Sequence, residues 1–437
     1  MSKYDTYKET DVIWFKELPA HWKRKRVKDV TQTLAGGTPD TSKEEYWEGS
    51  IPWLPSGKVQ NSIINEEDAD TFITEEGLKN SATKMLPAPA TLIALTGATC
   101  SNIGYLTFDA CANQSVVGMP GSSKILPKFL FYTLQSQKEQ ILLHQTGGAQ
   151  GGISESDVKF LFIPVPIESE QLTIANYLDD QTQKIDRLIA NKKAQAEKLK
   201  ELRQIEINNA VTKGLNPNAK MKDSGIEWLG KIPKHWEVKR VKNIGSIFNG
   251  STPSSSVESY WDGDIIWVTP GDFKNYRYSI DNSENKITDD GYKNCGTSLV
   301  PIGSIILTTR APIGNVLLAA KELCTNQGCK SIVPAKINSE FLYYYFSISS
   351  IQLNVFGQGT TFLELSTGNL STFKVPVPPA KEQIEIAHYL QKRTTAIDQL
   401  IKNIEEQIEK LQELRKIKIY EAVTGKIKVN AYAETTA

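Results

Sequence analysis

Apolar residues recur at heptad spacing along two long segments of the chain. The first segment, Glu170–Ala210, contains neither glycine nor proline. Leu178, Ile185 and Leu199 are separated by multiples of seven residues. Leu188 and Leu202 each lie three places after one of them. A second segment repeats the pattern with Leu390, Ile397, Leu400, Ile404, Leu411 and Leu414. This period is typical of the seam of a coiled coil, so each segment is predicted to form one long helix.

The residues ahead of the first segment alternate short apolar runs with turn residues. Ile51–Leu54, Thr91–Leu95 and Phe160–Val165 are β-rich runs bounded by glycine, proline or asparagine. Phe129–Leu143 instead has the apolar spacing of a helix. A mixed α/β unit with short strands is therefore predicted before the long helix.

The whole pattern occurs twice. Each tryptophan of the first half has a counterpart in the second half at one constant offset: Trp14 and Trp228, Trp22 and Trp236, Trp47 and Trp261, Trp53 and Trp267. The two heptad segments match at a slightly smaller constant offset, the heptad offset, which relates Leu178 to Leu390. In contrast, Lys58–Leu95 barely resembles its counterpart Asp272–Leu307. Shared positions predict a common frame, and divergent loops predict two similar surfaces for two ligands that are not identical.

The expected fold is α/β (α+β), with two pseudo-symmetric globular units that are each followed by a long helix. Because one chain carries both helices, tethering favours an intramolecular antiparallel coiled coil. A coiled coil that only dimerises the protein is the alternative. The predicted segments are residues 1–168 and 221–379 for the globular units, 169–212 and 380–425 for the helices, 213–220 for a linker and 426–437 for a tail.

Charge and cysteine content narrow the class of protein. The net charge is zero, with 16 basic and 20 acidic residues in 1–169 and 17 basic and 14 acidic in 211–380. Proteins that bind nucleic acid tightly by themselves usually carry a basic excess, so this balance argues against tight DNA binding by the chain alone and leaves binding with help from a basic partner open. Five cysteines without a C-x-x-C pair argue against disulfides and zinc. No signal peptide or membrane span is seen, which favours a cytoplasmic location.

No constellation in the sequence predicts catalysis. The chain lacks a P-loop, a G-x-S-x-G turn, an H-E-x-x-H helix motif and a G-x-G-x-x-G motif after a strand. His21 and His235 stand in a duplicated P-x-H-W turn, where each is expected to pack against the adjacent tryptophan. Phe356–Thr360 resembles a methyltransferase loop for S-adenosylmethionine, but it follows a helical stretch and not a strand. We therefore expect no catalytic residues, no cofactor and no metal.

Two stretches resemble a known family. Met221–Gly230 followed by Ile232–Trp236 is similar to the opening of a target recognition domain in type I restriction-modification specificity (S) subunits. Pro376–Pro379, leading to Glu382-Gln383-Ile384, is similar to the exit of such a domain. The first copy carries both motifs, so the resemblance spans nearly the whole chain.

The resemblance implies a non-catalytic subunit that reads double-stranded DNA. Two target recognition domains would each read half of a split, asymmetric site, and the paired helices would act as a spacer between them. Two copies of a DNA adenine methyltransferase (M) subunit would dock on this frame, and motor-nuclease (R) subunits would complete a restriction enzyme. Base specificity then resides in side chains on variable loops at the groove edges.

Candidate DNA-binding residues lie in basic runs and in loops near strand ends. Arg310 stands in a loop that resembles a recurrent loop of these domains, where it can pair with guanine or neutralise a phosphate. A solvated loop arginine is the alternative, and the first copy has Ala98 at the matching place. The other candidates are Lys23, Arg24, Lys25, Arg26, Lys58, Thr96, Thr99, Gln150, Lys239, Arg240, Lys274, Gln358 and Thr360. For the basic runs, a solvated strand face is the alternative.

Two other functions remain open at this point. One is a stand-alone DNA methyltransferase or nuclease with an unrecognised motif, which activity of the purified chain would reveal. The other is a coiled-coil adaptor without a DNA role, which globular units without a basic face would favour.

Overall fold

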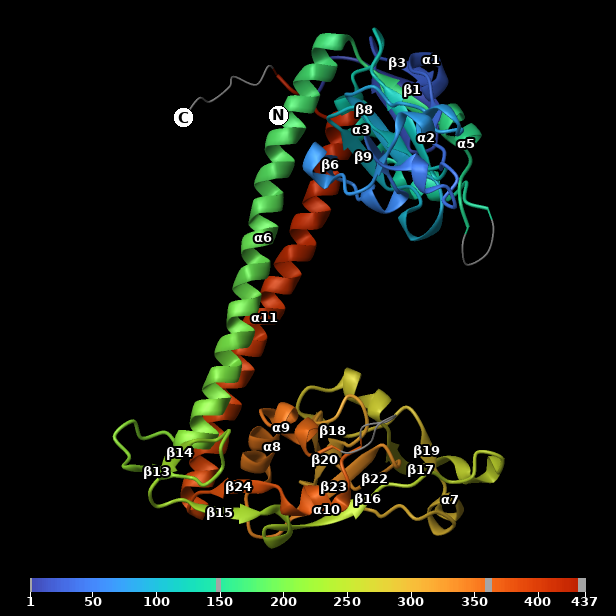
Figure 1. Cartoon of the computed structure of the whole chain (residues 1–437). Coiled ribbons are helices and arrows are strands. Elements are labelled where there is room, and N and C mark those ends of the chain that lie inside the picture. The colour runs from blue at the N-terminus through green and yellow to red at the C-terminus, as the bar shows by residue number, and fades with distance from the viewer. Residues whose placement is uncertain (1, 147–150, 358–363, 431–437) are drawn as a thin grey trace. The chain divides into compact units, whose positions relative to one another are not determined.

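The computed structural model describes residues 2–146, 151–357 and 364–430, and the chain divides into two compact units. One unit comprises Met1–Lys193 and Glu406–Ala437, and the other comprises Ala194–Glu405. Each unit therefore contains one globular part together with a section of both long helices (Figure 1).

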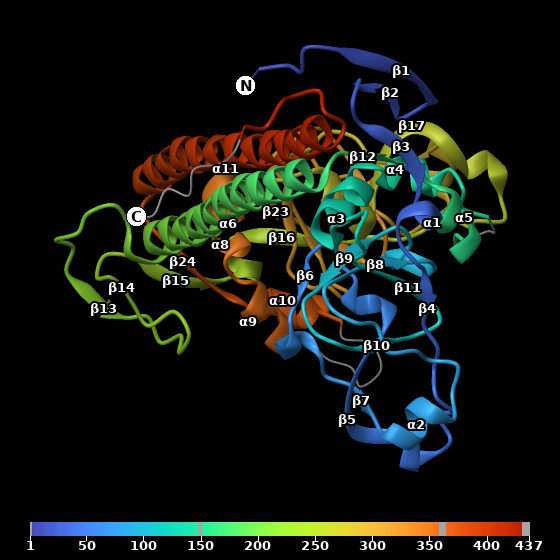
Figure 2. The same cartoon turned by 90° about the horizontal axis from the view of Figure 1, so that it is seen from above.

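The first unit is built on a five-stranded sheet with two fully buried inner strands. The strand order is β4 (Leu34–Ala35), β11 (Val116–Pro120), β8 (Ala90–Ala94), β9 (Ile103–Leu106) and β6 (Ile63–Ile64). Every residue of β8 and β11 is buried, as expected for strands covered on both faces. Helix α3 (Pro127–Ser136) packs on β8 and β9 (Figure 2).

Smaller elements complete this unit. A three-stranded sheet has the order β10 (Cys111–Ala112), β5 (Trp47–Leu54) and β7 (Phe72–Ile73), with α2 (Glu75–Lys79) beside it. Two-stranded pairs join β1 (Tyr7–Val12) to β2 (Phe15–Pro19) and β3 (Lys23–Arg26) to β12 (Phe162–Val165). The short helices are α1 (Val27–Val30), α4 (Lys138–Leu142) and α5 (Glu155–Phe160).

The second unit repeats this topology. Its five-stranded sheet has the order β16 (Gly245–Asn249), β23 (Cys329–Pro334), β20 (Ile305–Thr308), β21 (Val316–Ala319) and β18 (Ser279–Ile280). The three-stranded sheet is β19 (Lys286–Ile287), β17 (Trp261–Val268) and β22 (Cys324–Thr325), and the pairs are β13 (Met221–Asp223) with β14 (Lys231–Pro233) and β15 (Glu237–Arg240) with β24 (Lys374–Val377). The helices are α7 (Asp289–Lys293), α8 (Ser339–Ser347), α9 (Ser350–Val355) and α10 (Thr367–Thr372). The predicted duplication and α/β class are confirmed.

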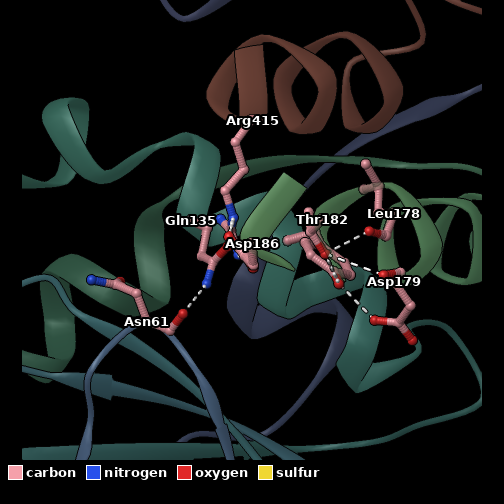
Figure 3. Close-up of polar contacts among 8 residues, drawn as sticks. Asn61, Gln135, Leu178, Asp179, Thr182, Asp186 and Arg415 are labelled. Atoms are coloured by element: carbon pink, nitrogen blue, oxygen red, sulfur yellow. Dashed lines mark hydrogen bonds and ion pairs between the residues drawn. The ribbon is translucent and has the colours of Figure 1, made fainter. Parts of the chain in front are cut away.

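The two long helices, α6 (Glu168–Lys213) and α11 (Ala380–Val423), pack side by side (Figure 1). In the first unit Arg415 donates from Nε to Asp186 Oδ1 at 3.0 Å (Figure 3). In the second unit Arg203 Nε lies 3.0 Å from Asp398 Oδ1. The two ion pairs are equivalent, because the heptad offset maps each residue of one pair onto a residue of the other. The predicted antiparallel pairing is confirmed, and it obeys the same pseudo-symmetry as the globular parts.

The seam between the helices differs in detail from the sequence prediction. Leu188 and Leu202 were expected in the seam, but their exposed fractions are 49% and 39%. Ile189 and Ala196 are buried instead. A heptad seam alternates steps of three and four residues, so the place four residues after Ile185 satisfies the same period as the place three after it. Leu188 and Leu202 therefore lie on an outer stripe of α6.

The P-x-H-W turns attach the globular parts to the helices. Trp22 and Trp236 are fully buried, as expected for large core side chains. Each histidine, which was predicted to pack against the adjacent tryptophan, is exposed and pairs with a glutamate in the first turn of a long helix. His21 Nε2 lies 2.9 Å from Glu170 Oε2, and His235 Nε2 lies 2.8 Å from Glu382 Oε2. A carboxylate near a helix N-terminus is favoured by the helix dipole, and here it also holds the adjoining turn.

A buried tyrosine of each globular part also contacts a long helix. In the first unit, Tyr132 of α3 donates to Asp179 Oδ1 at 2.6 Å and lies 3.2 Å from Thr182 Oγ1. Asp179 and Thr182 lie on α6 (Figure 3). In the second unit Tyr344 of α8 lies 3.3 Å from Thr394 of α11. Burial raises the pKa of both tyrosines, which keeps the hydroxyls protonated as donors.

Candidate nucleic-acid interface

A matching set of backbone hydrogen bonds lies in each unit at the edge of the five-stranded sheet where the central strand, β8 or β20, ends. This set is the backbone frame of the candidate interface. In the second unit, Thr309 N–H donates to the Gly328 carbonyl at 2.8 Å, and Leu365 N–H donates to the Thr309 carbonyl at 2.9 Å. In the first unit the same two bonds are Leu95 to Ser115 at 2.8 Å and Ile153 to Leu95 at 2.8 Å. The loops that leave this edge therefore start from equivalent backbone positions in the two units.

These bonds identify which side chains occupy equivalent places. Arg310 forms an isolated antiparallel bridge with Glu364, and Thr96 forms the same bridge with Gly152. Sequence comparison had matched Arg310 to Ala98, whereas the backbone pairing matches it to Thr96. The constant offset that relates Trp53 to Trp267 likewise maps Thr96 onto Arg310, so the match to Ala98 was wrong.

In the second unit the frame carries a cluster of charges. Arg310 Nε donates to Glu364 Oε2 at 3.2 Å, and Lys330 Nζ lies 3.9 Å from Glu364 Oε1. The Lys330 side chain is only 8% exposed, whereas that of Arg310 is 49% exposed. Burial lowers the pKa of the Lys330 amine, and the Glu364 carboxylate opposes that shift. Beside the cluster, Thr367 Oγ1 donates to Asn249 Oδ1 at 2.6 Å.

In the first unit the frame carries neutral side chains. Thr96 Oγ1 donates to Ser115 Oγ at 2.8 Å, and Thr99 Oγ1 donates to the Thr96 carbonyl at 3.4 Å. Thr96 is exposed, and Thr99 is half-buried. The structure thus brings these two predicted site residues together at one loop, which offers hydroxyl groups as donors and acceptors.

The predicted basic run of the first unit lies on β3 and covers aromatic side chains. The guanidinium of Arg24 lies 4.6 Å from the ring centroid of Phe162, and that of Arg26 lies 5.1 Å from the same ring. Arg24 also forms an ion pair with Asp11. Lys23 and Lys25 are exposed to solvent. Cation–π contacts give the arginines a structural role on this strand, and their role in DNA binding stays a prediction.

The remaining predicted residues are scattered over both units. Lys239 pairs with Glu237 at 2.7 Å on β15, where Arg240 is exposed. Lys58 Nζ lies 2.7 Å from Asp70 Oδ2, and this hydrogen bond holds the pKa of the Asp70 carboxyl below its usual value. Lys274 is exposed in the 3-10 turn Pro270–Asn275. Gln150, Gln358 and Thr360 lie outside the described residues.

Sequence reasoning missed Glu364 and Lys330, the two partners of Arg310. A usable signal existed for Lys330, because the first copy has the apolar residue Val117 at the equivalent place of the matching strand. Glu364 gave no signal, since its contact with Arg310 spans 54 positions along the chain.

Other kinds of site find no support in the described part of the chain. Within it, no group of three or more histidine, cysteine, aspartate or glutamate side chains is arranged to hold a metal ion. No helix in these ranges combines the length and apolar character that crossing a membrane requires.

Comparison with known proteins agrees with the duplicated architecture. The family model described as the type I restriction modification DNA specificity domain matches twice, over residues 19–198 and 233–410. The MjaIX specificity subunit of a type I restriction enzyme from Methanocaldococcus jannaschii is 42% identical over 190 residues, which is 43% of this chain and 43% of that protein. The chain thus matches less than half of that relative's length.

Two further similarities extend over nearly the full length. The putative MjaX specificity subunit from the same organism is 26% identical over 456 residues, which covers 98% of each protein. A chain from a structural study of complex assembly and conformational transition in a type I R-M system superposes with a TM-score of 0.74, at 17% identity, over 94% of this chain and 99% of that chain. At that identity the superposition establishes a shared fold.

Proposed function

Because the chain belongs to the type I restriction-modification DNA specificity family, we propose that it is the non-catalytic subunit that reads a split, asymmetric site in double-stranded DNA. Each globular part is a target recognition domain that reads one half-site. We assign these domains to residues 1–168 and 221–379, the two spacer helices to 169–212 and 380–425, the linker to 213–220 and the tail to 426–437.

The observation that carries this proposal is the pair of sheet edges with one backbone frame and different side chains. Equivalent backbone hydrogen bonds hold both loops, yet one presents Thr96 and the other Arg310. A frame that is kept while its outward side chains change is expected of two readers of different base sequences. An asymmetric site follows, since the two readers would prefer different bases.

We further propose that two copies of one methyltransferase (M) subunit dock on the helices, with motor-nuclease (R) subunits joining that complex. The support is an outer stripe of exposed apolar side chains that recurs on the second helix at the heptad offset. Its members, all at least 39% exposed, are Leu188, Leu202 and Ile205 on α6 and Leu400, Leu414 and Ile417 on α11. Apolar side chains kept exposed at equivalent places mark a surface that a partner covers twice.

The docking proposal predicts a stepwise loss of partner subunits. Leu188 belongs to the first unit and Leu400 to the second, and both are about half exposed. Introducing a buried charge into a covered apolar contact is strongly unfavourable. We therefore expect Leu188→Glu or Leu400→Glu alone to reduce the complex from two M subunits to one, and the double variant to bind none, as measured by native mass spectrometry of the co-expressed proteins.

The control lies on another face of each helix. Gln183 and Thr395 are exposed polar residues five places before Leu188 and Leu400, which is about 140° around each helix from these leucines. Gln183→Glu and Thr395→Glu should leave two M subunits bound. Retention of both M subunits by the Leu188→Glu, Leu400→Glu double variant would reject this surface as the docking site.

A further inference from the structure

The charged cluster of the second unit replaces an uncharged one at the same sheet edge. Register and backbone bonds give the equivalent pairs, first unit before second: Ala35 and Asn249, Thr96 and Arg310, Val117 and Lys330, Gly152 and Glu364. All four changes make the second unit more polar, and three of them introduce a charge. The backbone frame is unaffected by these changes.

The fold does not require these charges. Val117 is fully buried at its place in the first unit and belongs to the apolar core there. Lys330 takes that place in the second unit with its side chain 8% exposed. Burying an amine is unfavourable unless it is paired, and its only anionic partner within 2–146, 151–357 and 364–430 is Glu364, at 3.9 Å. A costly charge in a position that valine fills equally well points to a function other than folding.

The contacts of Glu364 leave one edge of Arg310 available. Glu364 accepts a hydrogen bond from Arg310 Nε, and this bond fixes the orientation of the guanidinium plane. No second partner of the Arg310 side chain is found among the described residues, and this side chain is 49% exposed. The two terminal amino groups therefore remain as a pair of parallel donors. This fork matches the O6 and N7 acceptors of guanine in the major groove.

The net charge of the cluster also favours a contact between Arg310 and DNA. Two cations share one carboxylate, so the cluster keeps a net positive charge at the edge from which the variable loops leave. Without Lys330, the pair of Arg310 and Glu364 would be neutral and would attract DNA less. The buried Lys330 amine, 3.9 Å from Glu364 Oε1, also attracts the carboxylate that orients the arginine.

We propose, on the basis of the function proposed above, that Arg310 reads a guanine in the half-site of the second domain. Glu364 is a positioning residue that fixes the guanidinium, and Lys330 is the counter-charge that keeps the cluster positive. The first domain, which carries Thr96, Val117 and Gly152 at these places, reads its half-site without this contact. The half-site of the second domain therefore contains one G·C pair that depends on Arg310.

The test is an adenine-methylation map of DNA from cells that co-express the full chain and its M subunit. Arg310→Lys keeps the charge and removes the fork, and Glu364→Gln keeps the shape and removes the carboxylate. We expect the preference for guanine at one position of one half-site to fall roughly tenfold or more in Arg310→Lys, as for loss of a bidentate contact. Glu364→Gln should weaken the preference at that same position. Every position of the other half-site should stay unchanged.

Two controls separate the possible outcomes. Thr96→Ser, at the equivalent place of the first domain, should leave the guanine position unchanged. Lys330→Val reproduces the first domain's residue and should lower the extent of methylation, with a weaker dependence on salt for the purified complex. An unchanged preference for guanine in Arg310→Lys, with methylation altered equally at all positions, would show a phosphate contact and overturn the proposal, as would an unchanged map. A wild-type map without a split site would reject the proposed function itself, whereas a split site that Arg310→Lys does not alter rejects only the guanine contact.

Discussion

A variant that lacks one heptad from each long helix is expected to recognise the same two half-sites with a gap shortened by about three base pairs. Residues 192–198 of α6 and 404–410 of α11 are equivalent under the heptad offset. Removing one heptad from a helix shortens it by roughly 10 Å, and one base pair rises by about 3.4 Å. Because a heptad seam repeats with this period, the seam residues on both sides of the deletion stay in register.

The measurement is the methylation map of the variant complex, compared with the wild type. Deleting the heptad from one helix alone is the control, since the ion pairs from Asp186 to Arg415 and from Arg203 to Asp398 can then no longer form together. We expect that single deletion to lower methylation at all sites. An unchanged gap in the double deletion, or altered half-site sequences, would contradict the role of the helices as a spacer.

Replacing Trp236 by alanine is expected to destabilise the second unit by about 3–5 kcal/mol, the usual cost of truncating a large buried aromatic side chain. Trp236 is fully buried and lies edge-on to Phe341, with ring centroids 6.3 Å apart. It also supports the end of α6, since a Cβ at Gly214, whose φ is +74°, would lie 3.2 Å from its ring. The loss should therefore open both the core of this unit and its attachment to the helix.

Amide hydrogen exchange measures this effect unit by unit. In Trp236→Ala, β20 and β23 should lose protection, while β8 and β11 of the first unit should keep theirs. Trp22→Ala, the equivalent change in the first unit, should produce the reverse pattern. Trp236→Phe should lose less protection because an aromatic ring is retained. Equal loss of protection in both units from either substitution would show that they do not unfold separately.

Features that repeat along the chain could be predicted from the sequence. Tryptophans paired at one constant offset revealed the duplication, and heptads revealed both long helices. The exact seam could not be predicted, because steps of three and four residues satisfy the same period. Only packing decides that Ile189 is buried while Leu188 is exposed.

Features that depend on distant parts of the chain could not be predicted. The sheet order, in which β11 lies between β4 and β8, results from pairing between segments far apart in sequence. The same holds for the cluster of Arg310, Lys330 and Glu364, which the fold assembles from three separate segments. A loop arginine was visible in the sequence, whereas the carboxylate that orients it was not.

The most direct test of the account is an adenine-methylation map of DNA from cells that express this chain together with its methyltransferase subunit. The account predicts a split motif with two unlike halves, which is absent when either protein is omitted. An unsplit motif, or methylation by this chain alone, would contradict it.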